Sequence, residues 1–254
     1  MRVLKEASKS EFRSPRWQIA PLGSCGDLAA ETAMDWPGIF QLDRVIPERR
    51  RTVPLLVRIA EILVSLTVLI LTAPIQLAIA IIIKLGTPGP ALFFQKRIGL
   101  NGKLFTFVKF RTLYADAKQR FPEMYAYQYT GKQLKSLHFK VEKDPRITPQ
   151  GIWLRKSTLD ELPNFWNVLK GDMALVGPRP EIPEMLRYYK NKMRLKFSVR
   201  PGITGLAQIS GRGRLSFFST VTLDLQYVRN RSFLMDVKIM LKTIYKILVR
   251  EGAF

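Results

Sequence analysis

The segment from Ile62 to Ile83 constrains this chain more than any other part, because it contains no charged residue. As an α-helix with a rise of ~1.5 Å per residue it would be about 33 Å long, close to the thickness of a bilayer's hydrocarbon core. Soluble proteins of this size seldom bury so long an uncharged helix. The segment also lies too far from the N-terminus for a signal peptide. It therefore predicts a membrane helix at about residues 59–85.

The flanks of this segment and the proline inside it predict how the helix sits in the membrane. Lys/Arg-rich loops tend to stay cytoplasmic, and both flanks are basic. Pro74 lies near the middle, where its ring removes an amide donor and clashes with the Ile70 carbonyl. A helix broken at Pro74 keeps both ends on one side, so we expect a re-entrant hairpin rather than a span. The basic flanks are Arg44, Arg49, Arg50, Arg51 and Arg58 before the segment, and Lys84, Lys96, Arg97, Lys103 and Lys109 after it.

The net charge of the chain narrows the classes of molecule that it is expected to bind. It has 41 Lys and Arg against 20 Asp and Glu, a formal net charge of +21. Such a charge favours a polyanion: nucleic acid, an anionic membrane surface or a phosphorylated substrate. With an apolar helix and no RNA-binding signature, we expect anionic lipid and no nucleic acid. The single histidine, His138, and single cysteine, Cys25, exclude a multi-histidine zinc site and a disulfide scaffold.

The rest of the chain predicts an α+β fold that is mainly helical. Residues 1–50 indicate a loosely ordered cytoplasmic extension, and residues 51–254 a single domain. Asn101-Gly102 between two β-rich runs predicts a hairpin. The run from Phe233 to Arg250 is amphipathic, with a basic residue at every fourth position. It fits a helix on the membrane surface and, equally, a solvated face over a core.

Asp160 and Glu161 are the strongest candidates for chemistry. They begin a helix that we expect to end at Gly171, with either a capping box of Thr158 and Glu161 or a start nearer Asp160. Adjacent carboxylates at a helix start usually only complement its dipole. Here, however, arginine-bearing turns surround them: Arg155 with Lys156, then Gly177–Pro180, Arg200–Gly205 and the turn at Arg212.

These turns suit a phosphorylated ligand. Glycine permits close backbone approach, and a guanidinium grips phosphate oxygens through two parallel hydrogen bonds. Of two carboxylates in such a setting, one can attack phosphorus while the other holds a divalent cation. The pattern therefore predicts phosphoryl chemistry on a diphosphate.

Four motifs together resemble a known family. They are KFRTL at Lys109–Leu113, DPRIT from Asp144, the long block from Leu154 to Glu181, and RPGITGLAQISGRG from Arg200. From about Val53 to its C-terminus the chain resembles the bacterial sugar transferases, also called monotopic phosphoglycosyl transferases or polyprenyl-phosphate hexose-1-phosphate transferases. It resembles their small form, which has one re-entrant helix and no added transmembrane bundle.

The resemblance implies transfer of a sugar-1-phosphate from a UDP-sugar to membrane polyprenyl (undecaprenyl) phosphate, with release of UMP. This is the first membrane step of exopolysaccharide, O-antigen or glycoconjugate synthesis, at the cytoplasmic face of the bacterial inner membrane. It implies Asp160 as the nucleophile that carries the phosphosugar and Glu161 as the ligand of Mg²⁺.

The resemblance also implies phosphate-contacting or structural roles for Arg155, Arg179 and Arg212. Asp224 matches a family position without an assigned role. The alternative function is a non-enzymatic scaffold that binds anionic lipid at the membrane surface. It explains the charge and the anchor equally well, but not the carboxylate pair among arginine-bearing turns.

Overall fold

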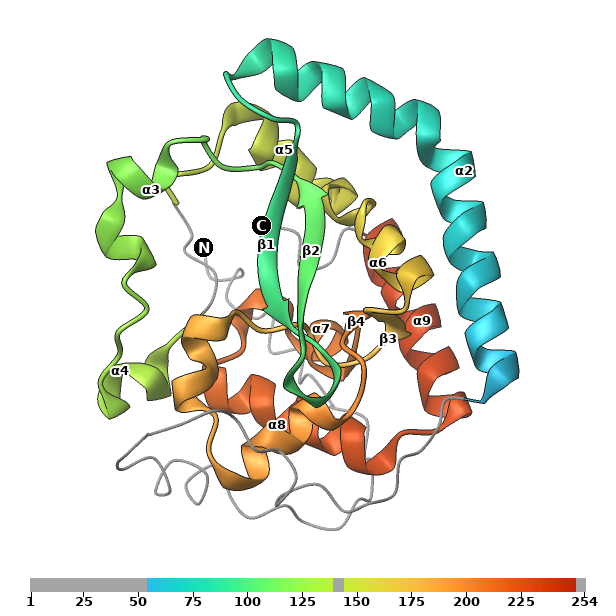
Figure 1. The fold of residues 1–254 in the computed structure, drawn as a ribbon. Helices are drawn as coiled ribbons and strands as arrows, with labels where there is room; N and C mark the ends of the chain where they lie inside the picture. Colours follow the sequence, from blue (N-terminus) through green and yellow to red (C-terminus); the bar gives the residue numbers. More distant parts are fainter. Residues whose placement is uncertain (1–53, 139–143, 250–254) are drawn as a thin grey trace, which may run out of the picture.

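A computed structural model describes residues 54–138 and 144–249, and the predicted extension at residues 1–50 lies outside them. The described part is mainly helical and carries two small sheets (Figure 1). Its helices of a full turn or more are α2 (Leu55–Gly86), α3 (Ala117–Arg120), α4 (Gly131–Ser136), α5 (Pro149–Ser157), α6 (Asn164–Lys170), α7 (Leu206–Ser210), α8 (Phe217–Asn230) and α9 (Phe233–Leu248). Short 3-10 helices, among them η4 (Leu159–Glu161), η5 (Pro183–Tyr188), η6 (Asn191–Ser198) and η7 (Arg212–Arg214), join them.

The apolar segment forms α2, a helix long and apolar enough to cross a membrane by length and composition. The helix is not interrupted at Pro74, but it bends near its middle, as the proline in that position predicts (Figure 1). The Thr72 hydroxyl donates to the Val68 carbonyl at 2.6 Å and accepts from the Gln76 amide at 2.9 Å. Because a threonine hydroxyl that bonds back to a carbonyl bends a helix, Thr72 and Pro74 together account for a bend without a break.

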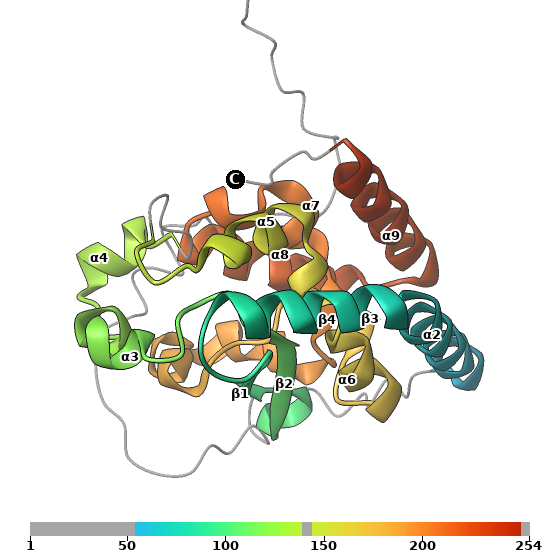
Figure 2. The same cartoon turned by 90° about the horizontal axis from the view of Figure 1, so that it is seen from above.

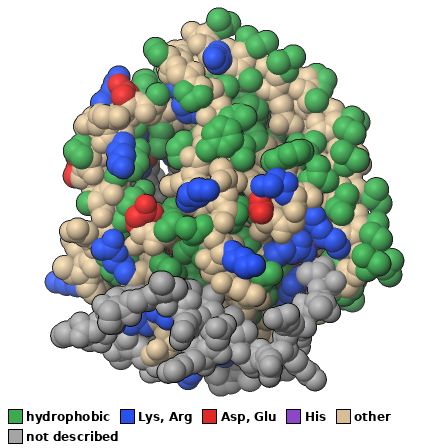
Figure 3. Space-filling model, viewed as in Figure 1, with side chains coloured by type: hydrophobic (Ala, Val, Ile, Leu, Met, Phe, Trp, Pro, Cys, Tyr) green, Lys and Arg blue, Asp and Glu red, His purple; other side chains and the backbone are tan. Residues whose placement is uncertain are grey.

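Most of α2 is exposed, yet both of its arms contact the same body of the protein. Its N-terminal arm packs on α6 and its C-terminal arm on α5. In the C-terminal arm, Ile79 and Ile83 are buried against Phe110 and Leu154. Hydrophobic side chains cover the edge that α2 forms, whereas Lys and Arg lie over the neighbouring face (Figure 3).

The hairpin forms where the sequence predicts it. Strand β1 (Leu92–Ile98) pairs antiparallel with β2 (Leu104–Phe110), in a register that sets Leu92 opposite Phe110. Asn101 adopts a left-handed conformation with φ 54°, followed by Gly102 with φ 77°, as a tight turn at this pair requires. Phe105, Phe107 and Phe110 are buried. The aromatic hairpin is therefore mostly core.

A second sheet pairs β3 (Ala174–Val176) with β4 (Gly202–Thr204) in parallel. The turn after each strand holds one of the predicted glycine motifs. A Cβ on Gly205 would lie 2.2 Å from the Gly177 carbonyl oxygen, and one on Gly177 would lie 2.5 Å from the Arg200 carbonyl oxygen. These glycines thus let the two turns pack against each other. At these two positions the close approach that glycine permits is to backbone, and binding of a phosphate by these turns stays a prediction.

Helix α9 confirms the amphipathic prediction for the C-terminal run. It contacts β3, β4 and α7, and it lies beside the N-terminal arm of α2 (Figures 1 and 2). Ile239 is buried against the core, while Leu241, Ile244 and Leu248 remain exposed. A solvated face over a core predicts polar residues at such positions, so the exposed apolar side chains favour the membrane-surface interpretation.

Candidate active site

Asp160 and Glu161 lie in η4, a single 3-10 turn between α5 and α6. Thr158 precedes the turn in a left-handed conformation with φ 63°, and its side chain makes no capping hydrogen bond. The capping box, one of the two alternatives for this helix start, is therefore absent, because an N-cap residue has extended backbone angles. The other alternative, a start nearer Asp160, is not observed either, since α6 begins at Asn164. The predicted end of the helix is confirmed: α6 ends at Gly171, whose φ is 92°. The carboxylate pair thus occupies a short irregular turn rather than the first turn of a long helix.

The Asp160 carboxyl is buried, with 7% of the residue exposed. Burial raises its pKa to about 6, and the neighbouring Glu161 carboxylate adds to the rise. The cations Lys109, Arg179 and Arg155 act in the opposite direction. Asp160 is therefore ionised at neutral pH but weakly solvated, which is the condition of an activated carboxylate nucleophile.

Lys109 is a site residue that our sequence reasoning did not single out as one. It lies on β2, which contacts η4, and burial lowers the pKa of its ammonium group to about 8. Its Nζ lies 5.7 Å from the centre of the Phe93 ring. The available signal was the KFRTL motif, which begins at Lys109; alternation gives none, because it puts Lys109 on the same face of β2 as the buried Phe107.

Arg155 lies in the last turn of α5, on the Asp160 side of the site. Its Nε donates to the Thr112 hydroxyl at 3.1 Å. Burial lowers the pKa of its guanidinium, and the Asp160 carboxylate acts against that shift. A Cβ on Gly151 would lie 2.2 Å from the Thr112 carbonyl oxygen, so glycine is required for α5 to approach β2 this closely. The structure thus brings Arg155 to Asp160, as predicted.

Arg179 reaches the second carboxylate. Its Nη2 lies 2.6 Å from Glu161 Oε1, and 44% of the Arg179 side chain is exposed. The Glu161 carboxylate is the main cause that raises the pKa of Arg179. This ion pair places a solvent-facing guanidinium on the turn that carries Asp160.

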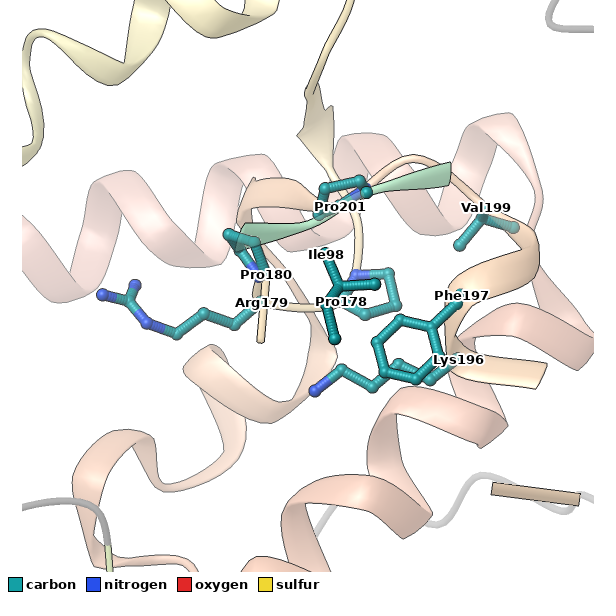
Figure 4. A pocket seen from close by; sticks show the side chains of 9 residues that line it. Ile98, Pro178, Arg179, Pro180, Lys196, Phe197, Val199 and Pro201 are labelled. Atoms are coloured by element: carbon teal, nitrogen blue, oxygen red, sulfur yellow. The ribbon is translucent and has the colours of Figure 1, made fainter. Parts of the chain in front are cut away.

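The turn that carries Arg179 is fixed from several sides. Arg97 donates to the Pro180 carbonyl at 3.1 Å, the Ile98 amide donates to the Glu181 carbonyl at 2.8 Å, and the Gly177 amide donates to the Thr204 carbonyl at 2.8 Å. A small hollow beside this turn is lined by Ile98, Pro178 and Phe197, among others. The Arg179 side chain extends away from that hollow (Figure 4). The hollow is therefore separate from the carboxylate pair.

Two cations that the sequence placed on anion-binding surfaces have internal partners instead. Arg200, in the third arginine-bearing turn, lies 2.7 Å from Glu61 of α2. Lys196 lies in the basic run Arg187–Arg200, whose sequence favours anionic headgroups as its partner, but it is buried 3.1 Å from Asp224. The side chain of Arg212 lies outside the described residues, although its backbone forms the start of η7. A phosphate contact by Arg212 stays a prediction.

Asp224 and Lys196 belong to a buried group that we call the core cluster: Glu181, Tyr189, Lys196 and Asp224. The Tyr189 hydroxyl donates to Glu181 Oε2 at 2.6 Å, and Lys196 Nζ donates to that hydroxyl at 3.1 Å. Burial raises the pKa of Asp224, and Lys196 acts against the rise. Every member is buried, so Asp224 is paired with a lysine inside the core rather than in the candidate site.

The carboxylate pair supplies only part of the set of ligands that Mg²⁺ requires. Among residues 54–138 and 144–249, no group of three or more Asp, Glu, His or Cys side chains is arranged to hold a metal. Mg²⁺ is, however, commonly held by one or two carboxylates together with substrate phosphates. Two adjacent carboxylates beside several cations fit that mode, with Glu161 the more accessible of the two.

Comparisons with known proteins agree with this arrangement. A family model described as bacterial sugar transferase matches residues 53–250. The galactosyl transferase CpsE of Streptococcus agalactiae is 45% identical over 166 residues, which are 65% of this chain and 36% of that protein. The undecaprenyl-phosphate galactose phosphotransferase of Salmonella typhimurium is 36% identical over 205 residues, 81% of this chain and 43% of that protein.

The relatives differ in length. The match spans less than half of the first relatives, but 86% of the exopolysaccharide production protein ExoY of Rhizobium meliloti, which is 35% identical over 76% of this chain. The matched region contains η4, β2 and both arginine-bearing turns of the site. The carboxylate pair and its cations thus lie within the residues that the family model matches.

Proposed function

The chain belongs to the bacterial sugar transferase family, and from that premise we propose that it transfers a sugar-1-phosphate from a UDP-sugar to polyprenyl phosphate. One observation carries the proposal: a buried, ionised Asp160 lies beside Glu161 and among three cations. Such a group suits attack on a diphosphate, whose negative charge the cations offset. Names of relatives that include undecaprenyl-phosphate galactose phosphotransferase support the lipid phosphate as the acceptor.

In the first step, a carboxylate oxygen of Asp160 attacks the β-phosphorus of the UDP-sugar. An O–P bond forms to Asp160, the bond from that phosphorus to the bridging oxygen breaks, and UMP leaves with that oxygen. Lys109 and Arg155 are placed to stabilise the charge that develops on the transferred phosphoryl group. The product of this half-reaction is an aspartyl-phosphosugar.

In the second step, a phosphate oxygen of the polyprenyl phosphate attacks the same phosphorus. The O–P bond to Asp160 breaks, the Asp160 carboxylate is regenerated, and a polyprenyl-diphosphate-linked sugar is released. Arg179 is exposed and adjacent to Glu161, so it can exchange that partner for a phosphate oxygen of either substrate.

Glu161, and Asp160 before it is phosphorylated, are the residues that would hold Mg²⁺. When bound, Mg²⁺ supplies a positive charge that offsets the diphosphate oxygens. Glu161 is paired with Arg179 at 2.6 Å in this structure. Glu161 would therefore share its carboxylate between Mg²⁺ and Arg179.

The membrane elements explain how the site reaches a lipid substrate. Both arms of α2 contact the body that carries η4, and α9 exposes apolar side chains near the N-terminal arm. We propose that α2 enters one leaflet as a re-entrant helix at the cytoplasmic face of the bacterial inner membrane, with α9 on the surface. Anionic headgroups would bind the exposed Lys238 and Lys242 of α9.

Intact-mass analysis tests the chemistry. Purified protein is incubated with Mg²⁺ and UDP-galactose, UDP-glucose or an N-acetylated UDP-sugar, without acceptor. We expect release of UMP and a mass increase equal to one phosphosugar, which polyprenyl phosphate then removes. If product accumulates with no adduct on Asp160, the nucleophile is wrong. If no common UDP-sugar yields UMP, the lipid-binding scaffold is the better function.

Labelling tests the re-entrant arrangement. Cys25 is the single cysteine and lies before α2, so a membrane-impermeant maleimide reports the side on which that part of the chain lies. We expect labelling from the side of the catalytic domain, and a shift towards the opposite side in Pro74→Ala, because a straight helix favours a span. Labelling of the unmutated protein only from the opposite side would contradict the re-entrant arrangement.

A further inference from the structure

A buried carboxylate fastens the N-terminal arm of α2 to the body. Glu61 lies in the second turn of α2 and is 5% exposed. Its Oε2 accepts hydrogen bonds from Arg200 at 2.7 Å and from Arg58 at 3.3 Å. Ser65, one turn later, is also buried, so this face of α2 is the one that docks. We call Arg58, Glu61 and Arg200 the anchor clamp.

One half of the anchor clamp leads to the carboxylate pair. Arg58 donates to the carbonyls of Val168 and Leu169, both at 2.8 Å. These carbonyls lie in the last turn of α6, where the helix dipole is negative, and the Val168 carbonyl also accepts from the Gly171 amide at 3.0 Å. The other end of α6 directly follows η4. Arg58 therefore holds the short helix on which the turn with Asp160 and Glu161 is mounted.

The other half of the anchor clamp leads to the turn that carries Arg179. Arg200 also donates to the Met173 carbonyl at 3.3 Å, just before β3. The next residue, Pro201, accepts from the Ala174 amide at 2.7 Å, where β3 and β4 join. Strand β3 then runs into the turn of Arg179. Through Arg200, Glu61 is linked to the turn that carries Arg179.

Docking of α2 alone does not require a charge. Its C-terminal arm docks through Ile79 and Ile83 against Phe110 and Leu154, all apolar. An apolar contact at Glu61 would serve adhesion equally well, since buried ion pairs are often replaceable by packed hydrophobic side chains. What the charged contact adds is a fixed geometry, because guanidinium hydrogen bonds are directional.

We propose that Glu61 is a positioning residue. Through the anchor clamp, the contact of α2 with the body fixes the positions of Asp160 and Arg179. The proposal rests on the proposed function for its kinetic consequence, but not for its structural one. It predicts that the site is fully assembled only while α2 is seated on the body, so that the enzyme is competent where its lipid substrate is found.

The test compares Glu61→Gln with Asp116→Asn in the full chain, reconstituted in lipid vesicles. Asp116 is an exposed carboxylate paired with Arg120 on the surface, so its variant is the matched control. For Glu61→Gln we expect unchanged retention on the vesicles, a fall in kcat of about tenfold or more, and a KM for the UDP-sugar within about threefold of the unmutated value. Glu61→Asp should recover part of kcat.

Hydrogen exchange separates this proposal from the proposed function. In Glu61→Gln we expect faster amide exchange in residues 159–170, which cover η4 and α6, and no change there in Asp116→Asn. Equal exchange in Glu61→Gln and the unmutated protein would overturn the proposal, whatever the activity. If Glu61→Gln does not fold, Arg58→Gln, which leaves Glu61 paired with Arg200, is compared in the same way, and unchanged exchange there would equally overturn it. Absence of UMP release by the unmutated protein would count against the function only.

Discussion

The site around Asp160 and the core cluster around Asp224 contain the same kinds of side chain but have different roles. Each has two carboxylates with cations beside them. In the core cluster the cation is the buried Lys196, and at the site the cations are Lys109, Arg155 and Arg179. In the core cluster, Lys196 contacts Asp224, Glu181 and Tyr189, all of which are buried. At the site, Arg179 is exposed and Glu161 is its partner on an open turn. Enclosed charges that satisfy one another stabilise a fold, whereas charges that face an opening are free to meet a substrate.

The largest expected effect separates the two aspartates. Asp160→Asn should lower turnover by about 10³-fold or more, because the amide cannot act as the nucleophile. It keeps the size of the side chain, and it removes a buried charge whose pKa is raised, so thermal unfolding should not occur at lower temperature. The matched variant Asp224→Asn should retain turnover in proportion to folded protein. Near-normal turnover by Asp160→Asn would show that Asp160 is not the nucleophile.

The two lysines give the next largest contrast. Lys196→Met leaves the Asp224 and Glu181 carboxyls buried without their cation, so the free energy of unfolding should fall by about 3–5 kcal/mol. Denaturant titration measures this loss.

Lys109→Met should lower turnover rather than stability. We expect turnover to fall by about 10²-fold, since one donor is lost near the phosphoryl group, with the free energy of unfolding changed by less than about 1 kcal/mol. The UMP release assay and denaturant titration, applied to both lysine variants, check the pair. A loss of stability in Lys109→Met equal to that in Lys196→Met would erase the distinction between site and core cluster.

The smallest effect is the pH dependence. Attack requires ionised Asp160, whose pKa is raised to about 6, so kcat/KM should fall about tenfold per pH unit below pH 6. Because Asp160 and Glu161 interact, this apparent pKa belongs to the pair. Stability moves the other way: a carboxyl with a raised pKa stabilises the fold while protonated, and that contribution is lost as the pH rises from about 4 through 6. Asp160→Asn should lose this pH-dependent part, as unfolding at several pH values measures.

Much of the local structure could be read from the sequence. The apolar segment, the Asn101-Gly102 hairpin and the helix end at Gly171 are confirmed. Each depends on side-chain periodicity or on a left-handed backbone angle, which neighbouring residues fix. Two details differ from the expectation. Helix α2 bends at Pro74 without being interrupted, where the Thr72 hydroxyl bonds back to the Val68 carbonyl, and Thr158 is left-handed, so the capping box, one of two alternatives for the helix start, does not form.

By itself, the sequence determined where the carboxylate pair lies in the chain and that arginine-bearing turns follow it. Only the tertiary structure decided which cations reach that pair and which are used elsewhere. Arg155 and Arg179 lie at the site, whereas Lys196 is enclosed with Asp224 and Arg200 is held by Glu61, which is 139 residues away in the chain. The reason is physical: a charge acts over a few ångströms in space, and the partners that fix its role come from segments whose approach only packing sets.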